Sequence, residues 1–405
     1  SDCYLPSCWR AGELVEARCK EIGESDAECA GRAEEARANY VAAFQAGWKT
    51  LPGYEANDWV DAGQAPDMFQ PAFNYRPRGS GQYMLAIRDF SDPENPKGFE
   101  FGFIGSSDNH TARAGTGYKE FARGAMTEGA GRRGDGDGLV AFLAGIRADE
   151  PAAESVPLDD SGRSALGLFE MERGAAYFVT GGLVAVHSPG RDRDSIWNSL
   201  QRREVYATSG RRILLWFDLL DETGALPMGS KAVRSDNPRF RVRAVGSFEQ
   251  KPGCPRHVVD AIGQERVDRL CLAECHHPSE TRRPITRIEV VRVRPQVSED
   301  EPVDGLVDDP WRVLPCPGDG TGCVVEFTDP EFVDSEREAV YYVRAIVAPD
   351  LLLHGQDPLL CRRDELGRCV EITPCGGNWP FEDVCLGEAE PRAWSSPIFV
   401  NHAGS

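Results

Sequence analysis

The C-terminal half of the chain is built from short apolar runs in which hydrophobic and polar residues alternate. The runs lie at residues 213–219, 240–245, 288–293, 324–327, 340–347 and 398–400. Alternation with a period of two puts one face of a strand against a core and the other in solvent, and Pro and Gly mark the turns between strands. No long helical pattern interrupts the series. The pattern predicts an antiparallel β-sandwich-like domain over residues 211–405.

The first 210 residues show a mixed α/β pattern. The run Ser25-Asp26-Ala27-Glu28 fits a capping box, which starts a helix by satisfying its first backbone donors. Apolar strands are expected at 99–105 and 177–187, and a short helix near 195–203 with Ile196 and Leu200 facing inward. A single core rarely grows beyond roughly 250–300 residues. We therefore expect two domains, residues 1–210 and residues 211–405.

The charge and the cysteine content limit the binding partners and the cellular compartment that we expect. The 405 residues include 45 Lys and Arg against 65 Asp and Glu, a net charge of −20, which argues against nucleic acid and against an anionic membrane surface. No apolar run approaches the roughly 20 residues that span a bilayer. The 13 cysteines, many of them in loops rich in Pro and Gly, favour disulfides in an oxidising compartment. We therefore expect a periplasmic or secreted protein.

Individual cysteine groups allow more specific interpretations. Cys316 and Cys323 flank a short Gly-rich loop, so we expect them to pair. The run from Cys271 to His277 contains two thiols and two imidazoles, which favours disulfide pairing and leaves zinc as the alternative. Eight further cysteines are expected to form disulfides in an N-terminal helical hairpin and in a late loop: Cys3, Cys8, Cys19 and Cys29, and Cys361, Cys369, Cys375 and Cys385. Because 13 is odd, at least one cysteine is a thiol or pairs outside this chain.

The sharpest chemical signal follows the expected strand at 99–105. In an extended backbone residues i and i+2 point the same way, so Asp108 and His110 project together from the strand exit. A carboxylate beside an imidazole suits Zn, Mn or Fe. An Asx turn capping the next helix is the structural alternative. Arg113 lies in the Gly-bearing loop that follows, where it can bind an anionic oxygen.

These residues carry a resemblance to a known family. The run Gly105-Ser106-Ser107-Asp108-Asn109-His110, followed by Arg113 and Gly115–Glu120, resembles the bacterial domain-of-unknown-function family "thirty-six oh four", a branch of the PHP (polymerase and histidinol phosphatase) metal-hydrolase superfamily. Further matching motifs are Thr180-Gly181-Gly182-Leu183, Arg202–Gly210, Gln250–Pro255 and Trp394–Ile398.

The resemblance implies both a fold and an activity. It implies the later part of a distorted (β/α)7 barrel in residues 1–210, followed by the β domain. It also implies a divalent transition metal held by Asp108 and His110, with Arg113 contacting a small-molecule ester, and phosphoesterase-like hydrolysis by metal-activated water. His187, which ends the strand at 177–187, is expected to hydrogen-bond or to face the substrate rather than to bind metal.

One departure from the superfamily pattern stands out. The superfamily opens with a His-x-His pair, whereas this sequence has no His before His110. We interpret the chain as the C-terminal portion of a longer protein whose upstream segment supplies the missing ligands, so that the metal can be absent from this portion alone. The alternatives are an exported, non-catalytic binding or structural protein with a relict barrel, and a hydrolase that uses Ser107 as the nucleophile with His110.

Overall fold

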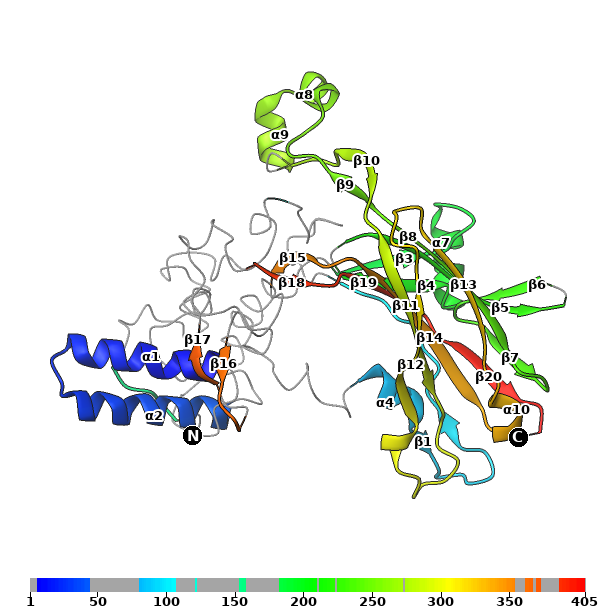
Figure 1. Ribbon diagram of the computed structural model, residues 1–405, viewed down its shortest axis with the longest axis horizontal. Coiled ribbons are helices and arrows are strands. Elements are labelled where there is room, and N and C mark those ends of the chain that lie inside the picture. The colour runs from blue at the N-terminus through cyan, green and yellow to red at the C-terminus, as the bar shows by residue number, and fades with distance from the viewer. Residues whose placement is uncertain are drawn as a thin grey trace. The chain divides into compact units, whose positions relative to one another are not determined.

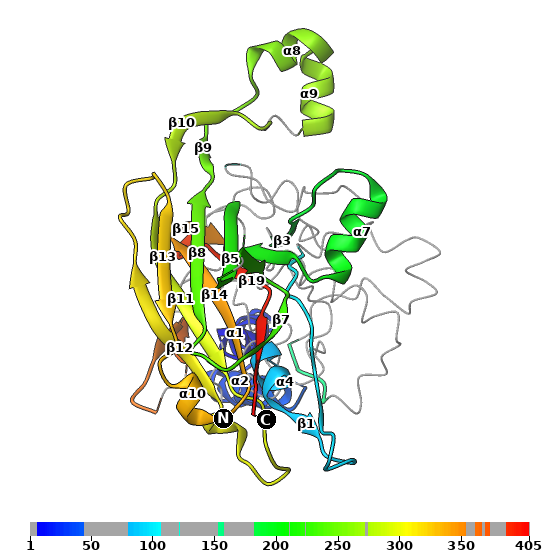
Figure 2. The same ribbon diagram turned by 90° about the vertical axis from the view of Figure 1, so that its right-hand side faces the viewer.

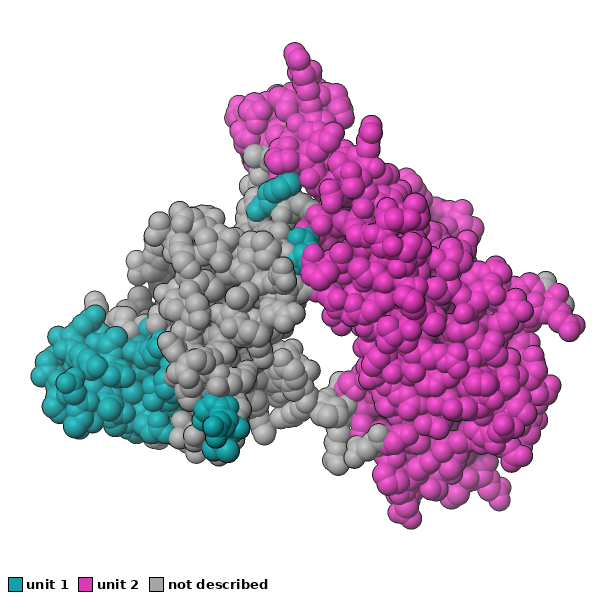
Figure 3. All heavy atoms as spheres, viewed as in Figure 1, with its two compact units in different colours: residues 1–75, 108–180, 350–389 teal, residues 76–107, 181–349, 390–405 magenta. Residues whose placement is uncertain are grey.

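The computed structural model describes residues 6–43, 80–106, 121, 153–157, 182–209, 211–222, 224–271, 274–353, 361–366, 369–372 and 386–404. The chain divides into two compact units, coloured separately in Figure 3. Unit 1 comprises residues 1–75, 108–180 and 350–389, and unit 2 comprises residues 76–107, 181–349 and 390–405. The predicted domain boundary at residue 210 falls inside unit 2, between two of its strands. Among the described residues, no helix is both long and apolar enough to cross a membrane.

The described part of unit 1 contains a helical hairpin and two small strand pairs. Helix α1 (Pro6–Glu21) packs on α2 (Asp26–Ala43), and the turn between them uses Gly23 at a φ of 88°. The Ser25 hydroxyl accepts a hydrogen bond from the Glu28 amide at 3.3 Å, as the predicted N-cap requires. The predicted disulfide link between the helices is confirmed for Cys19 and Cys29, both fully buried.

The two strand pairs described in unit 1 both lie within residues 350–389. Strand β15 (Asp350–Leu353) pairs with β18 (Leu386–Ala389), and β16 (Cys361–Arg363) pairs with β17 (Cys369–Ile372), both antiparallel. The expected disulfides at Cys3 and Cys8 and at the four late cysteines involve side chains that lie outside the described residues.

Unit 2 is a mixed but mostly antiparallel β structure with a sandwich-like pair of sheets (Figure 1). The larger sheet has the strand order β12 (Val307–Pro315), β11 (Ile285–Val293), β14 (Ala339–Val347), β19 (Arg392–Ser395), β4 (Val205–Ser209), β3 (Gly182–Val186), and β20 (Ile398–His402) joins β14 to β7 (Lys231–Arg234). The smaller sheet has the order β13 (Cys323–Thr328), β8 (Arg239–Gly246), β5 (Ile213–Asp221), β6 (Gly224–Pro227). All six predicted alternating runs are strands of these two sheets.

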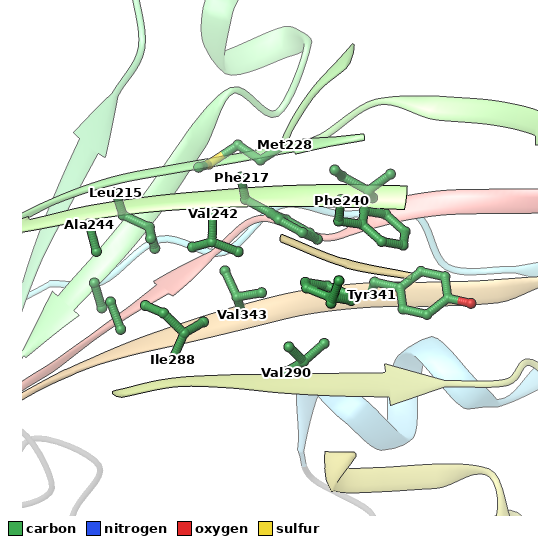
Figure 4. Packing of buried hydrophobic residues seen from close by; sticks show 14 of the residues in the cluster. Leu215, Phe217, Met228, Phe240, Val242, Ala244, Ile288, Val290, Tyr341 and Val343 are labelled. Atoms are coloured by element: carbon green, nitrogen blue, oxygen red, sulfur yellow. The ribbon is translucent and has the colours of Figure 1, made fainter. Parts of the chain in front are cut away.

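The core of unit 2 lies between the two sheets. Along β5 and β8 every second residue is buried, which is the alternation that the sequence shows. Figure 4 shows these side chains facing those of β11 and β14 across the core: Leu215, Phe217, Phe240 and Val242 against Ile288, Val290, Tyr341 and Val343. Fully burying a side chain of this size contributes about 1.5–3 kcal/mol, so this layer is the main source of stability in unit 2.

Smaller elements complete unit 2. Helix α4 (Gly81–Ala86) and the hairpin of β1 (Arg88–Asp89) with β2 (Lys97–Gly98) precede the sheets, α7 (Arg193–Gln201) joins β3 to β4, and η7 (Val303–Gly305) and α10 (Phe332–Ser335) are single turns. The predicted helix at 195–203 is confirmed as α7, but the prediction that Ile196 and Leu200 face inward is wrong. Both are more than a third exposed, because α7 turns the small, fully buried Ser199 toward the protein.

A separate arm extends from the sandwich. Strands β9 (Phe248–Gln250) and β10 (Pro278–Arg282) form an antiparallel ribbon, and helices α8 (Arg256–Ile262) and α9 (Gln264–Cys271) lie at its end. Figure 1 and Figure 2 both show the two helices projecting beyond the sheets. The alternating pattern did not indicate this arm.

Candidate functional site

The predicted ligands Asp108 and His110 and the predicted substrate contact Arg113 lie outside the described residues. The structure does describe residues 99–106, which lead into them and which we call the approach segment. The prediction that residues 99–105 form a strand is wrong, because the described segment makes no ladder with a neighbour.

Glycine contacts fix where the approach segment runs. A Cβ on Gly102 would lie 2.7 Å from the Ser396 Oγ, and one on Gly105 would lie 3.0 Å from the Leu183 carbonyl oxygen. A Cβ on Gly182 would lie 2.1 Å from the Ser106 carbonyl oxygen. Real Cβ atoms essentially never come closer than 3.0 Å to a main-chain oxygen, so Gly182 needs glycine for space, and Gly102 and Gly105 are tightly packed. The segment therefore passes directly against β3 and β4.

Ser396 ties the segment to β4. Its hydroxyl accepts a hydrogen bond from the Phe103 amide at 3.0 Å and donates one to the Val205 carbonyl oxygen at 2.6 Å. The Ser396 side chain is fully buried, so both bonds are shielded from water. Neighbouring Ser395 accepts from the Val343 amide at 3.0 Å. The Trp394–Ile398 motif thus joins the approach segment to the centre of the larger sheet.

Aromatic packing holds the same segment from the other side. The ring of Phe103 meets that of Tyr342 edge-on, with centroids 5.1 Å apart, and Phe101 lies 5.8 Å from Phe103. Both phenylalanines pack on a buried cluster that includes Leu85 and Phe399. Burial raises the pKa of Tyr342 to about 12, with the nearby Asp309 carboxylate adding to the effect. The segment is therefore anchored through both its backbone and its side chains.

The Arg202–Gly210 motif serves the fold where it is described. Arg203 adopts a φ of 60° and donates from Nε to the Gly229 carbonyl oxygen at 3.0 Å. Arg202 pairs with Glu204 at 2.7 Å, and the Tyr206 hydroxyl donates to the Ile213 carbonyl oxygen at 2.9 Å. Each of these polar groups is satisfied by a neighbour in the protein. These contacts shape the turn into β4 and join β4 to β5.

His187 has the hydrogen-bonding role expected from the sequence. Its Nε2 donates to the Leu215 carbonyl oxygen at 2.8 Å, and its ring lies between Tyr206 and Trp216, with centroids 5.4 and 5.7 Å away. Burial raises the pKa of nearby Asp218, while Arg243 and His187 act in the opposite direction. A ring held in this way links the end of β3 to the smaller sheet.

The disulfide predictions are confirmed for Cys275, Cys316 and Cys323 but not for Cys271, which carries a thiol. Cys316 pairs with Cys323, and Cys275 pairs with Cys254 in the arm. The partner of Cys275 was not predicted, because 21 positions separate it from Cys254 and the sequence carries no information on pairing. His277, part of the same run, donates from its amide to the Gln250 Oε1 at 2.8 Å.

Comparison with known proteins identifies one family. Residues 88–218 match the family described as "Protein of unknown function (DUF3604)", which is the resemblance found in the sequence. The matched stretch contains the approach segment, Asp108, His110, Arg113, β3 and β4. No curated protein and no solved structure matches the chain.

Proposed function

We propose that this protein is a metal-dependent hydrolase of the phosphoesterase type, with its chemistry centred on Asp108 and His110. One observation carries the proposal. Three motifs of the family resemblance, at Gly182–Leu183, Arg203–Ala207 and Trp394–Ile398, contact the approach segment, which itself carries the motif residues Gly105 and Ser106 and leads into Asp108. Close contact with Gly182 and the hydrogen bonds of buried Ser396 hold the approach segment in place. This is consistent with a precise position for Asp108 and His110, which follow the segment.

The donor set suits the proposed cofactor. Asp108 supplies a carboxylate oxygen and His110 a neutral imidazole nitrogen, which together are typical ligands of Zn, Mn or Fe. A bound divalent metal supplies Lewis acidity and lowers the pKa of a coordinated water toward about 7. Arg113 binds the anionic oxygens of the ester and offsets the charge that grows on them.

The proposal also includes the fold around the site and the cellular compartment of the protein. We place Asp108 and His110 in the later part of a PHP-like barrel, whose other ligands come from an upstream segment of the protein. The described disulfides suggest an oxidising, extracellular environment. We therefore propose a periplasmic or secreted enzyme that acts on a small-molecule ester.

The test is elemental analysis of the complete gene product, purified without chelator, together with assays on chromogenic phosphate and sulfate esters. We expect at least one Mn, Fe or Zn per chain, and loss of both metal and turnover in Asp108→Asn and in His110→Ala. Asp236→Asn and His257→Ala change exposed residues of the same types and should alter neither.

Two results would reject parts of this proposal. If either ligand variant retained wild-type metal content and turnover, the assignment of Asp108 and His110 would be wrong. If the complete wild-type protein contained almost no metal and cleaved none of the esters, the chain would be better described as an exported binding or structural protein.

A further inference from the structure

The arm carries three cysteines whose sulfur atoms lie together. Cys254 and Cys275 form a disulfide, and Cys271 carries a thiol. The three Sγ atoms all lie within 4.8 Å of one another, and all three residues are half-buried. Among the described residues this is the only group of three or more potential metal-binding or thiol side chains that come this close. The group lies apart from the approach segment and has no part in the proposed hydrolysis.

The backbone of the arm holds the three sulfurs in place. At its base the Lys251 amide donates to the His277 carbonyl oxygen at 2.7 Å, and the Cys275 amide donates to the Gly253 carbonyl oxygen at 3.3 Å. These bonds place the two ends of the arm side by side. Cys271 is the last residue of α9, and the Glu274 amide donates to its carbonyl oxygen at 3.0 Å. This turn brings the Cys271 side chain back to the disulfide.

The helices of the arm bury few apolar side chains, so the disulfide at its base matters for its structure. Within α8 and α9 the only buried side chain is Val267, while Ile262 is 36% exposed and Leu270 is 47% exposed. A two-helix unit with one buried apolar residue gains little from burial. The covalent link at the base therefore decides how tightly the arm is closed.

Two chemistries fit three clustered cysteines, and the geometry separates them. Zinc binds cysteine as the thiolate, whereas two of these three sulfurs are bonded to each other. Thiol–disulfide exchange requires one thiol next to one disulfide, which is what the arm contains.

We propose that Cys254, Cys271 and Cys275 form a thiol–disulfide exchange site. The Cys271 thiol loses its proton to solvent, and the thiolate attacks one sulfur of the Cys254–Cys275 bond. A new S–S bond forms to the attacked sulfur, the old bond breaks, and the other cysteine leaves as a thiolate and takes up a proton. One disulfide and one thiol are present before and after, so no oxidant or reductant is consumed. Attack on Cys275 releases Cys254 and opens the base of the arm.

Single substitutions in the full chain test whether the alternative pairings can form. In a glutathione redox buffer, Cys254→Ser should form a Cys271–Cys275 disulfide and Cys275→Ser a Cys254–Cys271 disulfide, both identified by mass spectrometry of unreduced digests. Cys316→Ser is the matched control, since it leaves Cys323 outside any such cluster among the described residues, and no new disulfide should join Cys323 to the arm. If both arm variants keep their two arm cysteines as thiols, the proposal fails.

The wild-type protein provides the second test. Slow alkylation at about pH 8.5 should label Cys254 or Cys275 as well as Cys271, because exchange moves the thiol among the three positions. Cys271→Ser should abolish labelling at all three positions. Label confined to Cys271, or stoichiometric zinc uptake by the unreduced protein, would overturn the proposal.

Discussion

Gly182→Ala gives the most direct test of how the approach segment is held. The added Cβ would lie 2.1 Å from the Ser106 carbonyl oxygen, and ordinary contact begins at 3.4 Å, so the two backbones must separate by about 1.3 Å. A flexible side chain could yield cheaply, but a main-chain carbonyl moves only with its segment. The segment is fixed by the Ser396 hydroxyl and by the packing of Phe103 on Tyr342. We expect a loss of about 1–3 kcal/mol in the free energy of unfolding, the usual cost of overpacking.

The measurement is urea unfolding with the slope checked for constancy, combined with amide hydrogen exchange in residues 182–209. Gly305→Ala is the control, because a Cβ there meets nothing within 4 Å and the stability should change by less than about 0.5 kcal/mol. Faster exchange in β3 and β4 should accompany the lower stability of Gly182→Ala. Equal stability of the two variants would show that the approach segment does not press on β3.

Two further predictions concern buried polar groups of unit 2. Asp329 is buried and accepts hydrogen bonds from Arg292 at 3.0 Å and from the Tyr341 hydroxyl at 2.7 Å. Because Arg292 keeps its ion pairs with Asp308 and Glu331, Asp329→Asn should cost about 1–3 kcal/mol in urea unfolding. Glu326→Gln, which loses an exposed pair with Arg241, should cost less than about 1 kcal/mol, and equal losses would contradict the argument from burial. Because burial raises the pKa of Tyr342 from 10.0 to about 12, the folded state keeps this proton to higher pH than the unfolded chain. The stability that Tyr342 contributes is therefore present below pH 10 and lost as the pH rises toward 12. In Tyr342→Phe the free energy of unfolding, measured with urea, should fall by about 2–3 kcal/mol less over that range than in the wild type. An unchanged slope would refute it.

Much of the sandwich could be predicted from the sequence because alternation is a local property. Residues 240–245 alternate and form a strand with the predicted buried face. Residues 340–347 are apolar except for Arg344, and they form a predicted strand that is buried on both faces except at Arg344. The Ser25 cap and the Cys316–Cys323 bond are also local, since each joins residues less than ten positions apart. The family resemblance came from short motifs, and the match over residues 88–218 confirmed it.

The approach segment shows where local reasoning failed. Its aromatic and β-branched residues favour a strand, yet the contacts that set its course come from Gly182, Ser396 and Tyr342, which are far away in the sequence. A period of two identifies the two faces of a segment but not its neighbour. The inward placement predicted for Ile196 and Leu200 failed for the same reason, since the periodicity of α7 does not say which face has a partner.

The sequence by itself determined which residues alternate and which cysteines can close short loops, because each depends on neighbours along the chain. Only the tertiary structure decided that β3 and β4 complete the larger sheet, that Cys254 pairs with Cys275 beside Cys271, and that three distant motifs contact the approach segment. Those contacts join residues up to 293 positions apart, as between Phe103 and Ser396, and they form only when burial of the shared core repays the entropy of closing such long loops.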